Sequence, residues 1–205
     1  FNSVIFVKIL KILMPNNTTI KSIDLNKEQF ISQVLNDYRI ICMSREASLL
    51  GRKEVLTGKA KFGIFGDGKE LAQLVMSKFF NKGDFRSGYY RDQTFMMAIG
   101  ELTVQEFFAG LYAHTDLEKE PNSAGRQMGG HFSTKSVDKD GNWLNLSDKK
   151  NTSSDISCTG AQMPRLVGLG LASKIYRQNK ELKDFNNFSN NGNEVAFGTI
   201  GDAST

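Results

Sequence analysis

The segment Glu194–Thr205, "EVAFGTIGDAST", decides the fold. Val195 to Ile200 is an apolar run typical of a buried strand, and Gly201 and Asp202 then form a tight turn. Open α/β sheets bind ligands at the carboxyl ends of their strands, so this turn is a predicted binding position. A carboxylate followed by backbone carbonyls suits Mg²⁺, although such a turn alone is more often an ordinary Asp cap before a helix.

Helical and strand patterns alternate upstream of this segment. Asn26 and Gln29 form a predicted capping box, and the apolar residues Phe30, Val34 and Tyr38 then recur at helical spacing. Such an apolar stripe is expected to face the core.

The remaining elements complete an α/β pattern. The stretch "GDFRSG" (83–88) predicts a turn into a short buried strand, and Pro164 stands in the first turn of a predicted helix. The alternation predicts a doubly wound sheet with helices on both faces, in which the final strand is central.

A glycine-rich loop precedes the helix that begins near residue 70. Gly63, Gly66 and Gly68 could present backbone N–H groups to a phosphate. Their spacing is not that of a dinucleotide or P-loop motif, and Asp67 with Glu70 predicts an ordinary capping box. Helix capping is therefore the favoured interpretation.

Composition excludes several function classes. The 205 residues carry a net charge of +4 with acids and bases intermixed, which does not indicate a nucleic-acid surface. Two cysteines and two histidines are too few for a zinc site. Reduced thiols are typical of a cytoplasmic protein, which is the expected location.

The chain begins with Phe1, and an apolar stretch with two lysines precedes Met14. This stretch is too short to span a bilayer and lacks a signal-peptide cleavage site. We expect residues 1–13 to be a non-native upstream extension and residues 14–205 to be the N-terminal part of one domain. A membrane-surface anchor is the alternative for residues 1–13.

Three further segments carry chemically useful side chains. Tyr90 and Arg91 follow a predicted turn, and an arginine fork with a tyrosine hydroxyl suits phosphate oxygens. A surface ion pair between Arg91 and Asp92 is the alternative.

His131 follows two glycines within a long polar stretch, Glu120–Asp155, that predicts a loop. It could act as an acid or base near neutral pH, or simply be hydrogen-bonded within the loop. Ser157 and Thr159 belong to a small-residue turn that leads into Gln162 and Pro164. This turn could present backbone groups to a flat polar ring, or serve tight helix–sheet packing.

Taken in order, these motifs resemble the thiamine-diphosphate-dependent first component of 2-oxo acid dehydrogenase complexes. The resemblance is to the α half and extends from about Asn26 to Thr205. The stretches "FRSGYYRDQTFMMAIGELTVQEFFAGLYAH" and "SAGRQMGGHF" are most similar to the branched-chain type, including versions whose α and β halves are fused.

The resemblance implies a role for each candidate residue. Tyr90 and Arg91 match the pair that contacts the cofactor diphosphate. Asp202 matches the acidic Mg²⁺ ligand, flanked by Gly201 and Ala203. The remaining matches are Ser157 and Thr159, at the turn whose backbone contacts the aminopyrimidine, and His131, the active-site histidine.

The resemblance also implies an oxidoreductase that uses thiamine diphosphate and Mg²⁺ to decarboxylate a 2-oxo acid and acylate a lipoyl group. The implied partners are the β half, fused or separate, and a lipoyl-bearing acyltransferase core. The sequence reads GDA where the family has GDG. The second metal-binding asparagine, a second histidine loop and the β-half glutamate are not in the sequence.

We therefore expect a truncated product that is inactive alone. Two alternatives stay open: a pyruvate or acetoin dehydrogenase α half, and a non-enzymatic phosphate- or nucleotide-binding α/β module.

Overall fold

The computed structural model describes residues 26–127, 129–154 and 159–201. The chain divides into two compact units, residues 1–35 and residues 36–205. Helix α2 (Lys27–Leu56) begins in the first unit. There the backbone N–H of Asn26 donates to the Gln29 side chain at 3.1 Å, and the Gln29 N–H donates to the Asn26 side chain at 2.8 Å. The predicted capping box is confirmed.

The buried face of α2 carries small and polar residues instead of apolar ones. Its buried residues are Ser44, Ala47, Ser48, Gly51 and Glu54. Phe30, Val34 and Tyr38 are 58%, 47% and 66% exposed, so the prediction that their stripe faces the core is wrong. Helical spacing fixes which residues share a face, but it does not fix which face a second element covers.

Three short parallel strands form the sheet, in the order β2-β1-β3. They are β1 (Phe85–Ser87), β2 (Asn151–Ser153) and β3 (Ala196–Gly198). The strands predicted around "GDFRSG" and after Glu194 are confirmed as β1 and β3, and the α/β class is confirmed with them. β3, predicted as a central strand, lies at the edge of the described sheet, and β1 is in the middle.

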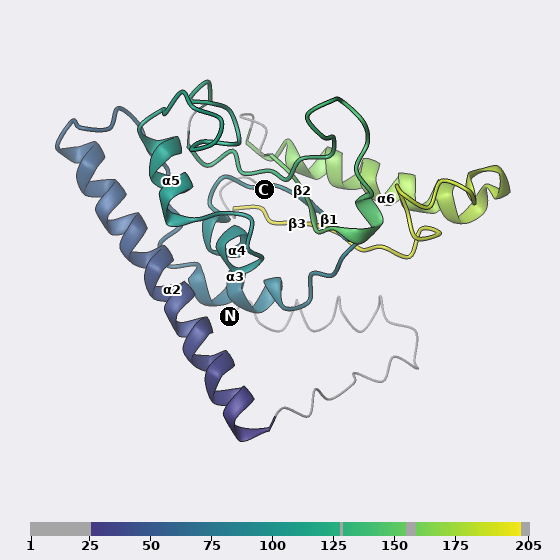
Figure 1. The fold of residues 1–205 in the computed structure, drawn as a ribbon, viewed down its shortest axis with the longest axis horizontal. Helices are drawn as coiled ribbons and strands as arrows, with labels where there is room; N and C mark the ends of the chain where they lie inside the picture. Colours follow the sequence, from purple (N-terminus) through teal and green to yellow (C-terminus); the bar gives the residue numbers. More distant parts are fainter. Residues whose placement is uncertain (1–25, 128, 155–158, 202–205) are drawn as a thin grey trace. The chain divides into compact units, whose positions relative to one another are not determined.

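Helices cover both faces of this sheet (Figure 1). On one face the Phe197 ring packs edge-on against Phe95 of α4 (Gln93–Ala98), with ring centroids 5.6 Å apart. On the other face the Ser87 hydroxyl donates to the Gln162 carbonyl at the start of α6 (Gln162–Gln178). Gly198, level with Ser87 across the sheet, lies against Met163 of the same helix. The strand alternation therefore separates the α4 face from the α6 face.

The core lies on the α4 side. Its buried cluster joins residues from α2, α4, the loops and α5 (Val104–Leu111): Ala47, Phe80, Phe95, Met96, Met97, Leu102, Phe107 and Phe132. The other elements are α3 (Glu70–Ser77), η1 (Leu146–Asp148) and η2 (Lys180–Leu182). Among the described helices, none is long and apolar enough to cross a membrane.

The strand order creates a switch point. The chain passes from β1 to β2 on one side and then returns to β3 on the other side of β1. At such a point the loops that leave two neighbouring strands diverge, and ligands of open α/β sheets bind in the resulting crevice. The carboxyl ends of β1 and β3 are therefore where a site is expected.

Candidate functional site

The turn that follows β1 presents Tyr90 and Arg91. The Tyr89 and Tyr90 rings lie 4.3 Å apart, and the Arg91 guanidinium lies over the Tyr90 ring at 5.2 Å. Its hydrogen bond to the Phe65 carbonyl is long, at 3.5 Å. Arg91 is thus held loosely by protein groups, and its fork keeps donors for a ligand.

Asp92 does not pair with Arg91, so the alternative interpretation of that arginine is wrong. Instead the buried Asp92 carboxylate accepts from the Arg86 Nε at 3.0 Å and forms an ion pair with the same guanidinium at 2.9 Å. It also accepts from the Thr199 hydroxyl, at 2.8 Å to the nearer carboxylate oxygen. These bonds join the loop after β1 to the residues after β3. Thr199 to Gly201 therefore lie beside the Tyr90–Arg91 turn.

The start of α6 reaches the same edge. Gln162, 1% exposed, donates its side-chain amide to the Thr199 carbonyl at 2.8 Å. Thr159 lies in the exposed turn just before this helix. Of the predicted site residues, Ser157, Asp202 and Ala203 lie outside the described residues. Tyr90, Arg91, Thr159 and Gly201 come from segments that converge on one edge of the sheet.

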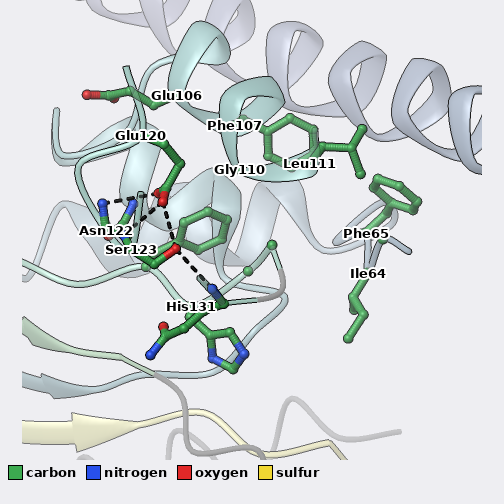
Figure 2. Close-up of a pocket in the computed structure, with 15 residues that line it drawn as sticks. Ile64, Phe65, Glu106, Phe107, Gly110, Leu111, Glu120, Asn122, Ser123 and His131 are labelled. Atoms are coloured by element: carbon green, nitrogen blue, oxygen red, sulfur yellow. Dashed lines mark hydrogen bonds between the residues drawn. The ribbon is translucent and has the colours of Figure 1, made fainter. Parts of the chain in front are cut away.

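The His131 loop packs on the same turn. Gly130 has a positive φ of +100°, and a Cβ atom there would lie 2.9 Å from the Tyr90 carbonyl oxygen. Only glycine permits this approach without a shift of the backbone. His131, the next residue, also lines a cavity of about 20 Å³ with Phe65 and Glu120 (Figure 2).

That cavity is polar at one end and holds roughly one water molecule. The Glu120 carboxylate accepts from the backbone N–H groups of Asn122, Ser123 and Gly125. Burial opposes ionisation of Glu120, but these bonds and the Ser123 hydroxyl lower its pKa overall. Figure 2 shows the His131 ring and the Glu120 carboxylate at different ends of the lining. The Glu120 carboxylate therefore holds its own loop, residues 120–125, and is 3% exposed.

Two backbone N–H groups of the glycine-rich loop already donate to protein side chains. The Gly66 N–H donates to the Gln93 side chain, and the Gly68 N–H donates to the Glu70 carboxylate. Glu70 is also bound by Arg45 at 2.6 Å; this hydrogen bond is the main reason that the Glu70 pKa is lowered.

A carboxylate thus already occupies the place that a phosphate would take. The predicted Asp67–Glu70 capping box is wrong, because Lys69 is the N-cap, without a side-chain cap bond. Asp67 instead pairs with Arg52. The loop still borders the site, since a Cβ atom on Gly66 would lie 2.4 Å from the Arg91 carbonyl oxygen.

Among the described residues no group of three or more His, Cys, Asp or Glu could hold a metal ion. The predicted ligand Asp202 lies beyond them. The residues that sequence inspection missed are Arg86, Asp92, Gln162 and Thr199. One signal was available: an arginine in a strand predicted to be buried requires a buried acid nearby.

Tyr89 provides a pH-dependent test of this turn. Burial, followed by its hydrogen bond with Tyr90, raises the pKa of Tyr89 to about 12. In the unfolded chain the Tyr89 hydroxyl should titrate near pH 10. Its burial in the folded state therefore stabilises the fold below about pH 10, and this contribution is lost as the pH rises towards 12. We expect urea unfolding between about pH 9 and pH 11 to show a steeper loss for the natural chain than for Tyr89→Phe. Equal slopes would contradict a buried, protonated Tyr89.

Comparison with known proteins identifies the family. Residues 39–205 match the model of the dehydrogenase E1 component family, whose members in general depend on thiamine diphosphate. The chain is also 28% identical over 151 residues to the 2-oxoisovalerate dehydrogenase subunit alpha of Bacillus subtilis (strain 168). That alignment covers 71% of this chain and 39% of the relative, so the chain spans about two fifths of the relative's length. Because the family model matches most of the chain, the chain belongs to the dehydrogenase E1 component family.

Proposed function

We propose that this chain is the α part of the first component of a branched-chain 2-oxo acid dehydrogenase. In this proposal it helps to decarboxylate a 2-oxo acid with thiamine diphosphate and Mg²⁺ and to acylate a lipoyl group. The whole-enzyme activity is proposed from the family, from the 2-oxoisovalerate dehydrogenase relative and from the site.

One observation carries the proposal: the Asp92–Thr199 hydrogen bonds hold the Tyr90–Arg91 turn against Thr199–Gly201 at the switch point of the sheet. These are the two segments that would face each other across a metal-bound diphosphate. The sheet edge on which they meet is the one expected for ligand binding.

The described residues fit such a cofactor. Arg91 keeps a partly free guanidinium, and the neighbouring Tyr90 hydroxyl adds a donor for diphosphate oxygens. Asp202, directly after Gly201, would supply a carboxylate to Mg²⁺. Thiamine diphosphate, when bound, supplies the electron sink that decarboxylation needs.

The other residues would bind, orient and move protons. The small-residue turn with Thr159, anchored through Gln162, would border the aminopyrimidine end of the cofactor. His131, on the loop that Gly130 seats against Tyr90, would donate or hold a proton near the reacting carbon during transfer to the lipoyl group.

The proposed partners follow from the same function. A β half, fused or separate, would complete the site, and a lipoyl-bearing acyltransferase core would receive the acyl group. We also propose a cytoplasmic location, because neither cysteine lies in a metal or disulfide pattern. A pyruvate or acetoin dehydrogenase α half would share these motifs. The 2-oxo acid that is decarboxylated distinguishes these two enzymes from a branched-chain 2-oxo acid dehydrogenase. The nucleotide-binding module is not favoured, because the amides of Gly66 and Gly68 are already used.

The test is a decarboxylation assay of this chain alone and of the full-length α half with its β half. We expect carbon dioxide release only from the full-length α half when the β half, thiamine diphosphate and Mg²⁺ are all present, and faster release from 2-oxoisovalerate than from pyruvate. Omission of the cofactor is the control. No release from any 2-oxo acid with all components present would refute the function, and faster release from pyruvate would reassign the substrate.

A further inference from the structure

The Asp92 carboxylate is the only described side chain that links the loop after β1 to the hydroxyl of Thr199. Asp92 is 2% exposed. Its oxygens accept from the Arg86 Nε at 3.0 Å, from the Thr199 hydroxyl at 2.8 and 3.1 Å, and from the Gln73 side-chain amide at 3.4 Å. A buried carboxylate held by fixed donors has little freedom to rotate, and no nearby water can replace a lost donor.

This link lies where the sheet stops holding the two segments together. β1 and β3 pair in parallel as far as Ser87 and Gly198. Beyond these residues the ladder ends, and at a switch point the two loops would separate. The Asp92–Thr199 bonds continue the connection one residue past the last paired residue of β3.

Thr199 is held on two sides. Its hydroxyl donates to Asp92 and its carbonyl accepts from Gln162. Removal of the hydroxyl alone therefore leaves the tie to α6 in place, together with the β1–β3 ladder. The contribution of the Asp92 bond can thus be separated from the folding of the sheet.

We propose that Asp92 and Thr199 are positioning residues that set the spacing between Arg91 and Gly201, and hence the span available to a diphosphate. Arg91 is the residue before Asp92, and Gly201 follows Thr199 by two residues. The identity of the ligand rests on the proposed function, whereas the spacing itself rests only on the contacts above.

The first test uses the chain without a ligand. Thr199→Val removes the hydroxyl at nearly constant shape, and Thr199→Ser retains it. We expect Thr199→Val to raise the hydrogen exchange of the Asp92 amide, which donates to the Tyr89 carbonyl at 3.1 Å, by about tenfold beyond its effect on global stability. Thr199→Ser should keep the natural exchange rates.

Thr152→Val is the matched control. Thr152 is a buried threonine of β2, 4% exposed, and donates its hydroxyl to the Met96 sulfur at 3.7 Å. Thr152→Val should leave the exchange of the Asp92 amide unchanged after the same stability correction. Unchanged exchange in Thr199→Val, or an equal rise in Thr152→Val, would overturn the proposal.

A second measurement separates this inference from the proposed function. Calorimetric titration of the full-length α half with its β half should show that Thr199→Val weakens binding of thiamine diphosphate with Mg²⁺ about tenfold, and that Thr199→Ser restores it. Faster exchange of the Asp92 amide with unchanged affinity would overturn the positioning role. Faster exchange with no binding even by the natural full-length protein would refute the proposed function while the spacing role stands.

Discussion

Replacement of Arg86 by methionine is expected to lower the free energy of unfolding by about 3–5 kcal/mol. Arg86 and Asp92 are 1% and 2% exposed, and the guanidinium also lies 5.3 Å from the centre of the Phe95 ring. Methionine fills much of the same volume but leaves the Asp92 charge buried beside fewer donors. A loss of this size is a large part of the about 5–15 kcal/mol that stabilises a typical domain.

The measurement is urea unfolding followed by circular dichroism. Arg52→Met is the matched control, because Arg52 and Asp67 also form an arginine–aspartate pair at 2.6 Å. That pair is exposed, so its loss should cost at most about 1 kcal/mol. If Arg86→Met lowered the free energy of unfolding no more than Arg52→Met, the buried Arg86–Asp92 pair would not stabilise the packing of β1 against α4.

Replacement of Arg91 by alanine is expected to weaken binding of thiamine diphosphate by about 10- to 100-fold, since charge-assisted hydrogen bonds contribute about 1.5–3 kcal/mol. The affinity of Arg91→Lys should lie between that of the natural chain and that of Arg91→Ala, because lysine keeps the charge and loses the planar fork. Stability should change little, because the one described hydrogen bond of the guanidinium is long, at 3.5 Å.

The titration is made on the full-length α half with Mg²⁺ and the β half present, and with thermal unfolding measured in parallel. Arg39→Ala, at an exposed position on α2, is the control and should bind as the natural chain does. If Arg91→Ala retained full affinity, or if Arg39→Ala lost as much, Arg91 would be a surface residue without a place in the site. A large drop in stability of Arg91→Ala would instead identify a structural role.

Several local elements could be predicted because their causes are local. The capping box at Asn26 depends on side chains three residues apart, and Pro164 favours a helix start through its fixed φ angle. The strands β1 and β3 could be predicted from "GDFRSG" and from the apolar run Val195 to Ile200, each a short segment next to glycine. β2 was missed because Asn151–Ser153 is polar and reads as loop, although Asn151 and Thr152 are buried.

Other features depended on which surfaces meet. The face of α2 that packs inward is chosen by close contacts: Gly51 lets the Phe65 ring approach, and Gln93 donates to the Ser48 hydroxyl at 2.8 Å. Hydrophobic periodicity therefore pointed to the wrong face. In the glycine-rich loop, the Gly66 and Gly68 amides that seemed open to a phosphate donate to the Gln93 side chain and the Glu70 carboxylate, and Arg45 on another helix binds Glu70.

The sequence by itself determined the element types, the α/β class, the family and the residue types of the candidate site, because these depend on neighbouring residues and on motif order. Only the tertiary structure decided that Arg86 and Thr199, 113 residues apart in the sequence, both bind Asp92. Parallel pairing of β1 with β3 brings these positions together, and the buried Asp92 carboxylate must be paired and hydrogen-bonded there because an unpaired buried charge is costly. No local pattern contains that information, since Thr199 is distant from Asp92 in the chain.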